Sequence, residues 1–413
     1  MVTKYDIFEF AYSYRHPLKP IEFVEHFKKT EQEYHLIHKQ LRELVKEGLL
    51  VKNSYGFQAK KSEKTDLMYN IIFHCLRNNI SYNYLLNPDM AQFLSRALQK
   101  KEVTSENANL NHITFRKYID ILSKNGLALI ISEKPLRVKV FYNILLNNIL
   151  VYFGYKHSII TEDKVDYLEE IVKEFKKFRT LKRRDLPRYQ ELMSGFQISF
   201  VQHSLSLEGN PVTLSQTKNI LKDKVIPANL KIEDVEEVKN YHKALLQMIA
   251  DTTQKILLTI ESILSYHGLA MQHRPEIAGK IRKIEVYIKG NPAFKIAKTK
   301  SIEKELQALI VRYDAFIAKK KPSIKEILNF AVYFHNQFQH IHPFEDGNSR
   351  TTRLIMFYLL QSKDIPILDI PFGLLDEYLS STKGSKKRED ERLYKNLQKI
   401  ILYNLKQVNK KLS

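Results

Sequence analysis

The strongest constraint on this chain is a helical spacing of apolar side chains that recurs through most of its 413 residues. Long segments carry apolar residues at positions i, i+3, i+4 and i+7, which form one face of an α-helix. Only 12 residues are glycine, so few positions interrupt these segments. We therefore expect a mainly α protein with few, short strands, and the length of the chain predicts more than one domain.

The composition is that of a folded chain, because 44% hydrophobic and 27% charged residues lie near the averages of globular domains. The formal net charge is +20, from 66 Lys and Arg against 46 Asp and Glu. This charge fits a polyanionic partner. It fits a solvated basic surface equally well, because the basic residues are spread along the whole chain.

Cysteine usage and the N-terminal segment indicate the compartment. The chain has one cysteine, Cys75, which excludes an internal disulfide and a multi-cysteine metal site and implies a reducing environment. Asp6 and Glu9 lie where a signal peptide has an uninterrupted apolar region, and no segment reaches about 18 consecutive apolar residues. We expect a cytoplasmic protein without a membrane partner.

The first half of the chain predicts helices followed by hairpins. The pattern of residues 1–62 predicts three amphipathic helices and then a short hairpin, which is the layout of a winged-helix-like domain. Residues 63–160 repeat the helix-then-hairpin layout and are expected to form a second winged-helix-like domain. Residues 161–194 are expected to be a helical connector, whose charged first helix stops before Pro187.

Two roles stay open for these domains. Winged helices often bind DNA through a helix in the major groove, and Arg116 and Lys117 lie near the start of a helix that suits this contact. In the first domain the corresponding helix opens with Glu31 and Glu33, which repel phosphates. The alternative is that both domains dock proteins or pair two copies of the chain as a homodimer.

The segment from residue 335 to residue 361 carries the clearest chemical pattern. Helical spacing on both sides is broken at Pro343 and Gly347, so the residues between them form a loop that joins two helices. A turn with glycine and asparagine before a helix N-terminus presents backbone N–H groups to an anion. We expect a phosphate to bind there.

Side chains around this loop suit polyphosphate chemistry. Arg350 and Arg353 lie three residues apart on one helix face, so both guanidinium groups can bind the same polyphosphate. Asp346 can hold Mg²⁺ through an oxygen while phosphates supply other ligands. We expect His342 to act as a general base toward an incoming hydroxyl.

The sequence HPFEDGNSRTTR, from His342 to Arg353, is similar to the Fic signature His-Pro-Phe-x-(Asp/Glu)-Gly-Asn-(Gly/Lys)-Arg-x-x-Arg. The resemblance implies that His342 deprotonates a target hydroxyl, that Asp346 binds Mg²⁺ and that Phe344 anchors the loop. One departure is Ser349, where the family has Gly or Lys most often, and a positive φ there would impose a steric cost on serine. By the same resemblance, the anion hole and the phosphate-binding side chains are Gly347, Asn348, Ser349, Arg350 and Arg353.

A second segment, residues 199–221, resembles the stretch that precedes the core of Fic proteins. Within it, Ser204-x-x-x-Glu208-Gly209 fits the inhibitory motif (Ser/Thr)-x-x-x-Glu-(Gly/Asn). In a helix, Ser204 and Glu208 lie one turn apart on one face. The resemblance implies that Glu208 pairs with Arg353 and occupies the charge meant for the γ-phosphate of ATP, which inhibits the enzyme within one chain.

A third segment, residues 257–298, predicts a helix, a loop and a period-2 hairpin around Gly290 and Asn291. By resemblance the hairpin is the Fic flap, which adds an extended target segment as an extra strand. His267 and His273 in this segment are expected to be ordinary core or surface histidines. The expected edge of the flap consists of Lys283, Ile284, Glu285, Val286, Tyr287 and Ile288.

These segments place the predicted Fic domain at residues 195–373, before a C-terminal helical segment at 374–413. The resemblance implies transfer of AMP from Mg-ATP to a Ser, Thr or Tyr hydroxyl of an unknown target protein, with self-modification included. Three alternatives stay open. The same site could remove AMP, with Glu208 positioning a water; it could use another nucleotide or a phosphate donor; or the chain could be a DNA-binding regulator whose Fic domain senses nucleotide.

Overall fold

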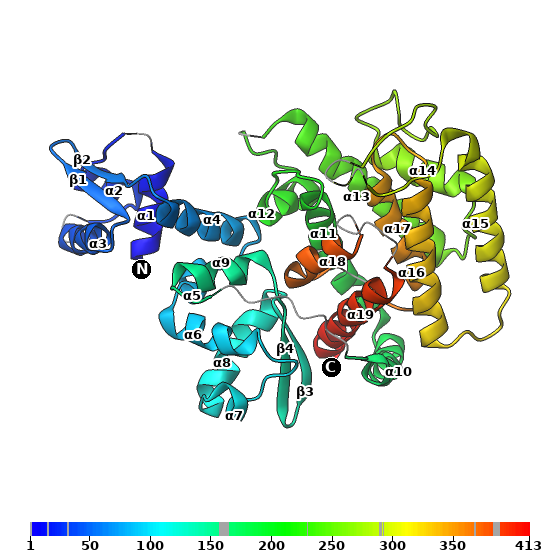
Figure 1. Cartoon of the computed structure of the whole chain (residues 1–413), viewed down its shortest axis with the longest axis horizontal. Helices are drawn as coiled ribbons and strands as arrows, with labels where there is room; N and C mark the ends of the chain where they lie inside the picture. The colour runs from blue at the N-terminus through cyan, green and yellow to red at the C-terminus, as the bar shows by residue number, and fades with distance from the viewer. Residues whose placement is uncertain are drawn as a thin grey trace. The chain divides into compact units, whose positions relative to one another are not determined.

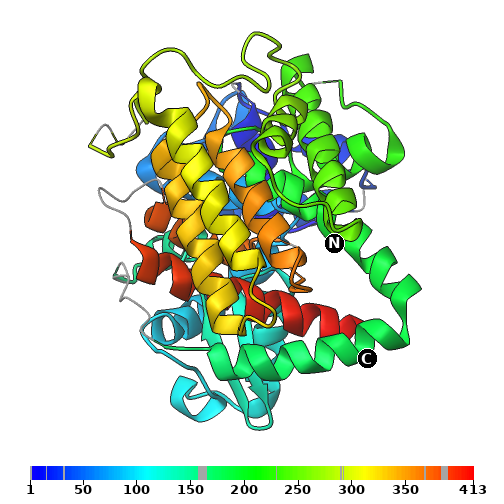
Figure 2. The same ribbon diagram turned by 90° about the vertical axis from the view of Figure 1, so that its right-hand side faces the viewer.

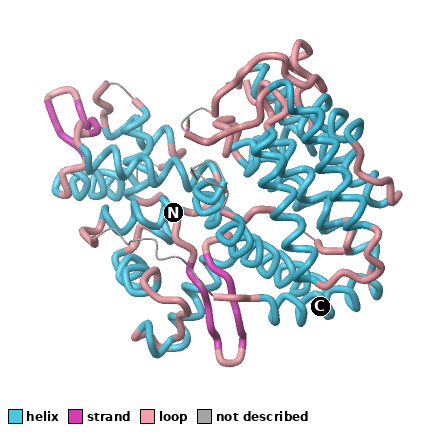
Figure 3. The backbone as a smooth tube through the Cα atoms, turned by 45° about the vertical axis from the view of Figure 1, so that its right-hand side comes forward, coloured by secondary structure: helices cyan, strands magenta, loops and turns pink. Residues whose placement is uncertain are grey.

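A computed structural model of the chain describes residues 2–14, 16–30, 33–156, 165–228, 230–288, 291, 293–366, 369–382 and 389–413. The described residues are mostly helical (Figure 1), with two antiparallel sheets of two strands each (Figure 3). The prediction of a mainly α protein is confirmed.

The elements follow one another along the chain, with short 3-10 or π turns at Asn219–Asp223, Thr299–Ser301 and Phe372–Leu374. They are α1 Lys4–Ser13, α2 Pro20–His26, α3 Tyr34–Lys46, β1 Leu50–Asn53, β2 Gly56–Ala59, α4 Glu63–Arg77, α5 Tyr82–Leu85, α6 Pro88–Ala97, α7 Ser105–Ala108, α8 His112–Lys124, β3 Ala128–Glu133, β4 Leu136–Val140, α9 Ile144–Tyr152, α10 Leu168–Arg184, α11 Leu186–Ser206, α12 Leu214–Lys218, α13 Ile232–Thr253, α14 Ile260–Ala270, α15 Ile302–Ile317, α16 Ile324–Ile341, α17 Asn348–Gln361, α18 Leu375–Thr382 and α19 Asp390–Leu412.

The described residues separate into two compact units. The first unit comprises residues 1–99 together with 144–159. The second comprises residues 100–143 together with 160–413. Each unit therefore draws on two separate stretches of the sequence.

In the first unit, three helices precede a hairpin, which is the element order predicted for residues 1–62. One face of α3 is buried against α1 and α2 through Ile37, Leu41 and Leu44, which lie at helical spacing. β1 pairs antiparallel with β2, and Leu18 and Phe57 exchange two backbone hydrogen bonds of 2.8 Å. These contacts enclose a small core of helices and hairpin.

Residues 63–160, predicted to be one domain, are divided between the two units. Helices α4, α6 and α9 belong to the first unit, whereas α8, β3 and β4 belong to the second. Leu129 and Phe141 of the β3–β4 region join the core of the second unit, and Tyr403 donates a hydrogen bond of 3.0 Å to the Ser123 carbonyl. The boundary differs from the predicted one because local patterns identify a helix and a hairpin but not the core against which they pack.

The described residues of the predicted helical connector, 165–194, are mostly helical and belong to the second unit. α10 lies along α19 (Figure 2) and buries Ile171 and Phe178 in the core of the second unit. Asp185 separates α10 from α11, whose first turn contains Pro187, a position at which proline is tolerated. The apolar face of α10 therefore determines its place, and its charges stay at the surface.

α17 is enclosed within the second unit, beside α16 (Figure 1). Its residues from Arg350 to Leu360 are all buried, and α13 and α14 also pack against it. Two arginines lie in this otherwise mostly apolar helix, which requires charged or polar partners for them. None of the described helices is both long enough and apolar enough to cross a membrane.

The described residues of the predicted flap contain no strand. Lys283–Ile288 is therefore irregular, and Gly290 of the predicted turn lies outside the described residues. The predicted alternation of buried apolar and exposed polar side chains is absent, because Arg282 is buried in this stretch, whereas Ile284 and Tyr287 are exposed. Two-stranded hairpins are marginally stable by themselves, and bonds from side chains to the backbone hold this segment instead.

Leu129→Ala tests whether β3 belongs to the core of the second unit. Leu129 is 1% exposed, so its truncation leaves a cavity, and we expect the free energy of unfolding to fall by about 2–5 kcal/mol. Ile113→Ala, at the start of α8, is the matched control because Ile113 is 85% exposed. Urea denaturation followed by circular dichroism measures both variants, and equally small losses would contradict this assignment.

Candidate active site

The loop that joins α16 to α17 is bounded by two left-handed backbone positions. His342 ends α16 with a φ of 49°, and Gly347 precedes α17 with a φ of 79°. Between them, the Asn348 side chain accepts a hydrogen bond from the Phe344 N–H at 3.0 Å and donates one to the Phe344 carbonyl at 2.8 Å. A left-handed conformation is costly for a non-glycine residue and is found most often at functional sites. The loop therefore holds His342 in one strained conformation beside the N-terminus of α17.

Glycine is required at position 347 for space as well as for φ. A Cβ on Gly347 would lie 2.9 Å from Met271 Sδ and 3.0 Å from His267 Nε2. Ser349, by contrast, lies inside α17 and has no positive φ, so the steric cost considered for serine is absent. The first N–H groups of α17 have no acceptor within the helix, which leaves its N-terminus open to an anion.

His267 of α14 packs against the loop and donates a hydrogen bond to it. Its ring stacks on Phe344 with the ring centroids 3.6 Å apart, and its Nδ1 accepts a hydrogen bond from the Gly279 N–H at 2.9 Å. The proton is therefore on Nε2, which donates to the Asp346 carbonyl at 3.0 Å. Burial lowers the pKa of His267 to about 4, so the ring is neutral at pH 7.

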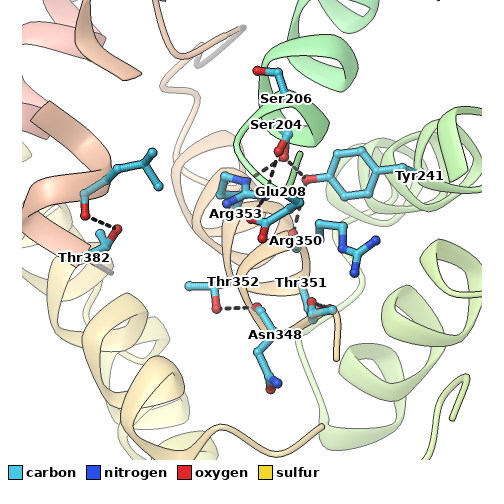
Figure 4. A network of polar contacts seen from close by, with 12 residues as sticks. Ser204, Ser206, Glu208, Tyr241, Asn348, Arg350, Thr351, Thr352, Arg353 and Thr382 are labelled. Atoms are coloured by element: carbon cyan, nitrogen blue, oxygen red, sulfur yellow. Dashed lines mark hydrogen bonds and ion pairs between the residues drawn. The ribbon is translucent and has the colours of Figure 1, made fainter. Parts of the chain in front are cut away.

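Arg353 is fully buried in α17 and is bound by the last turn of α11 and the turn that follows it. Its Nε donates to Ser204 Oγ at 2.6 Å, and its Nη2 donates to the Ser204 carbonyl at 2.9 Å and to Glu208 Oε1 at 2.8 Å. Burial alone would lower the pKa of Arg353, but the Glu208 carboxylate raises it above its ordinary value. The Glu208–Arg353 pair that the resemblance implies is present (Figure 4).

Tyr241 of α13 connects this turn to the backbone of α17. Ser204 Oγ donates to the Tyr241 oxygen at 2.8 Å, and the Tyr241 hydroxyl donates to the Arg350 carbonyl at 3.2 Å (Figure 4). Ser204 lies in the last turn of α11, whereas Glu208 lies just beyond the end of the helix. Gly209 follows with a φ of 97°, which glycine adopts without strain. The predicted inhibitory helix is therefore a helix end followed by a turn.

Arg350 and Asp346 lie in a second network of ion pairs. Arg350 Nη1 bonds to Glu237 of α13, and Arg350 Nη2 lies 3.0 Å from Asp346 Oδ1. Arg274 approaches the other oxygen of Asp346, Oδ2, at 3.0 Å. Burial alone would raise the pKa of the Asp346 carboxyl, but Arg350 and the Gly347 N–H hold it below its ordinary value. Asp346 is therefore ionised at pH 7.

Asp346 is a candidate ligand for a magnesium ion that is bound together with a nucleotide. Within the described part of the chain, no three His, Cys, Asp or Glu side chains gather as a closed metal site. Mg²⁺ at nucleotide sites takes one or two carboxylates, with water and phosphate oxygens as the remaining ligands. Asp346 supplies one such carboxylate, and both of its oxygens already face cationic groups.

Arg282 ties the segment after α14 to the loop. Its side chain is 0% exposed, its Nε donates to the His342 carbonyl at 2.8 Å, and its N–H donates to the Pro343 carbonyl at 2.9 Å. Its Nη atoms donate to the carbonyl groups of Ile284, at 2.9 Å, and Ala297. One buried guanidinium group therefore holds both arms of the predicted flap beside His342.

The Fic/DOC family model matches residues 257–360, which span α14, α15, α16 and nearly all of α17. The match includes the whole loop from His342 to Arg353 and the segment that Arg282 anchors. The chain contains a Fic domain.

Curated relatives of this Fic domain are named protein adenylyltransferase Fic. The relative from Drosophila persimilis is 32% identical over 172 residues, which are 41% of this chain and 32% of the relative. The relative from Drosophila melanogaster is 32% identical over 176 residues, which are 41% of this chain and 34% of the relative. The chain thus spans about a third of the length of these relatives.

Solved structures share the Fic fold with this chain. A Fic-domain-containing signaling protein from Bacteroides thetaiotaomicron superposes with a TM-score of 0.52 at 20% identity, covering 59% of this chain and 97% of that protein. Fic-1 from C. elegans superposes with a TM-score of 0.51 at 19% identity, covering 59% of this chain and 71% of that protein. These identities are low, so the likeness shows the fold alone.

Three residues of the Fic site were not predicted from the sequence. His267 was expected to be ordinary, Arg282 lies in an apolar alternation, and Glu237 lies in an acidic stretch of a long helix. Each contacts a group 60 to 113 residues away in the sequence. No local pattern could have identified them, because their partners are brought close only by the fold.

The Fic loop is expected to lose stability in acid through His267. Its folded pKa of about 4 lies below the ordinary 6.5, so the unfolded state takes up the proton first as the pH falls. The contribution of the neutral His267 ring to the free energy of unfolding is complete above the pKa of the unfolded state. It is lost progressively as the pH falls to the pKa of the folded state, by roughly 3 kcal/mol in all. Thermal unfolding against pH is expected to show a smaller slope in His267→Phe, which keeps the aromatic stacking and cannot be protonated.

The matching spectroscopic measurement is an NMR titration of the His267 ring in the wild type. A ring that titrates near its ordinary pKa, or equal pH slopes for wild type and variant, would contradict a buried neutral His267.

Proposed function

We propose that the chain is a protein adenylyltransferase, which transfers AMP from Mg-ATP to a Ser, Thr or Tyr hydroxyl of a target protein and is inhibited by its own Glu208. One observation carries this proposal: His342 and an ionised Asp346 flank the N-terminus of α17, while Glu208 is bound to a buried arginine of that helix. A helix N-terminus, a base and guanidinium groups suit attack on phosphorus. The Fic/DOC match and the relatives named protein adenylyltransferase support the same reaction class.

In this reaction His342 removes the proton from the target hydroxyl, and the hydroxyl oxygen attacks the α-phosphorus of ATP. The bond from the α-phosphorus to the bridging oxygen breaks, pyrophosphate leaves, and AMP remains on the target as a phosphodiester. The N–H groups at the start of α17, with Arg350 and Arg353, stabilise the charge on the phosphates. Asp346 would hold Mg²⁺, which neutralises charge on the polyphosphate.

Glu208 inhibits by occupying Arg353. A carboxylate on this guanidinium group takes the position of a γ-phosphate oxygen, so ATP is excluded or held in an unproductive pose. Because Arg353 is 0% exposed, displacement of Glu208 without a replacement would leave a buried charge unpaired. An incoming phosphate supplies that replacement.

Incubation with Mg²⁺ and α-labelled ATP, with and without cell lysate, tests the transferase. We expect at least about tenfold more labelled protein with Glu208→Gly than with wild type, because the site is then open to ATP. Adding His342→Ala is expected to lower the label about 10²–10⁴-fold, because the base is removed. Label without lysate would identify self-modification.

Each other outcome of this labelling has a meaning. Equal label with and without His342→Ala would contradict the role of His342. The absence of label in every sample would overturn the transferase. Release of AMP from pre-AMPylated protein by wild type but not by Glu208→Gly would then favour AMP removal, and label from γ-labelled ATP would favour phosphate transfer.

A second function, DNA binding, is favoured by the outer face of α3. Lys39, Arg42 and Lys46 are exposed there at spacings of three and four residues and line one shallow groove together with the exposed Glu43. Within the described residues, none of the three pairs with a carboxylate. A row of free cations along a helix that precedes a hairpin suits the phosphates of a duplex.

The contrast with α8 supports this choice of helix. Arg116, which the sequence favoured for DNA, bonds to Glu133 of the hairpin and lies 3.2 Å from Asp120. Glu33, which was expected to repel phosphates at the start of α3, pairs with Lys29 at 3.0 Å. We therefore propose α3, and not α8, as the DNA-contacting helix.

Fluorescence anisotropy with a labelled duplex at low salt tests DNA binding by the whole chain. The triple variant Lys39→Gln, Arg42→Gln, Lys46→Gln is expected to bind at least about tenfold more weakly and with a shallower salt dependence, because phosphate contacts release counterions. The control is Arg116→Gln with Lys117→Gln, for which we expect little change. Equal binding by the triple variant and wild type, or no binding by wild type, would overturn this proposal.

A further inference from the structure

The first arginine of the Fic signature, Arg350, is occupied as well as the second, Arg353. Arg350 is 5% exposed, and its two terminal nitrogens are both used: Nη1 bonds to Glu237 and Nη2 lies 3.0 Å from Asp346. Its third nitrogen, Nε, is buried and has no hydrogen-bond partner among the described residues. While Glu237 is in place, its carboxylate therefore occupies the Nη1 position of Arg350, where a phosphate oxygen would otherwise bind.

Asn210 joins Glu237 to the turn that carries Glu208. It follows Glu208 and Gly209 directly, and its side-chain Nδ2 donates to Glu237 Oε2 at 2.7 Å. The same nitrogen donates to the Asp234 carbonyl of α13 at 3.2 Å, while Asn210 Oδ1 accepts from the Val212 N–H at 3.0 Å. Asn210 is 6% exposed, so these bonds are shielded from water.

Apart from Asp346, two carboxylates from different elements therefore occupy the two guanidinium groups of the proposed phosphate site. Glu208 comes from the turn after α11, and Glu237 comes from α13. The Glu237 side chain is 15% exposed and that of Arg350 is 6% exposed. Breaking this ion pair without a replacement would therefore leave the Arg350 charge unpaired and poorly solvated. A phosphate that replaces Glu237 removes this penalty, as it does for Glu208 at Arg353.

We propose that Glu237 is a second inhibitory carboxylate and that Asn210 couples its release to that of Glu208. This inference rests on the proposed nucleotide site. When the turn after α11 moves, Asn210 withdraws its hydrogen bond from Glu237, and Arg350 becomes available together with Arg353. The site therefore opens as a unit and not one arginine at a time.

The opposite role for Glu237 would be to orient Arg350 for phosphate. That role predicts the opposite sign, because removal of the carboxylate would then weaken nucleotide binding. The contact of Glu237 with a terminal nitrogen of Arg350, the position that a phosphate oxygen would use, favours inhibition.

Calorimetric titration with Mg-ATP tests the proposal on wild type, Glu208→Gln, Glu237→Gln and the double variant. Both substitutions keep the shape of the side chain and remove its charge. We expect each single change to tighten binding and the double variant to bind at least about tenfold more tightly than Glu208→Gln. Glu236→Gln is the matched control, because Glu236 is the exposed neighbour of Glu237 with the same charge, and no change in affinity is expected.

Asn210→Asp tests the coupling with both carboxylates intact. Aspartate still accepts from the Val212 N–H, but it cannot donate to Glu237 and repels it, so we expect about fivefold or greater tightening of Mg-ATP binding. A non-additive cycle among Asn210, Glu208 and Glu237 is expected as well. Circular dichroism and melting temperature confirm that each variant is folded.

The outcomes separate this inference from the proposed function. If Glu208→Gln binds Mg-ATP and the added Glu237→Gln weakens that binding or leaves it unchanged, the inhibitory role of Glu237 is overturned and the proposed transferase activity is unaffected. If the double variant binds Mg-ATP more tightly than Glu208→Gln but labels no protein, the inhibitory role of Glu237 is supported and the proposed transferase activity is overturned. If no variant binds any nucleotide, both fail.

Discussion

The buried guanidinium group of Arg353 is the constraint on which the second unit depends. An arginine cannot be deprotonated in a protein, so a side chain that is 0% exposed requires polar partners at all times, and here one of them is an anion. That anion is Glu208, and Ser204 satisfies further donors of the same guanidinium group. The turn after α11 is therefore a structural partner of α17 and also the group that a nucleotide phosphate would replace. Inhibition, in this view, is part of the charge balance of the fold.

The proposed base and the proposed phosphate site are held by different parts of the molecule. His342 is fixed by its left-handed backbone and by the bond from Arg282 to its carbonyl, and His267 supports the loop through Phe344 and Asp346. None of these contacts involves the turn after α11. The base is therefore preformed while the arginines are occupied, which places control of the proposed reaction at nucleotide binding and not at proton transfer.

The parts that could be predicted from the sequence are those in which spacing along the chain determines geometry. His342 and Asp346 lie on one loop, and Arg353 lies in the helix that follows it. The breaks in helical spacing at Pro343 and Gly347 predicted this loop. The parts that could not be predicted depend on which core buries a segment. The alternation from Lys283 to Ile288 resembled a strand, but the burial of Arg282 among carbonyl groups kept it irregular. Likewise β3 and β4 joined the second unit because of contacts with α19, which no local period encodes.

Calorimetric comparison of Mg-ATP with Mg-ADP, on wild type and Glu208→Gln, tests the central claim most directly, because ADP lacks the γ-phosphate expected at Arg353. We predict that Glu208→Gln tightens the binding of Mg-ATP by about tenfold or more and changes the binding of Mg-ADP much less. An equal gain for the two nucleotides would show that Glu208 does not compete with the γ-phosphate. No gain for either would contradict the view that the Glu208–Arg353 pair closes this site.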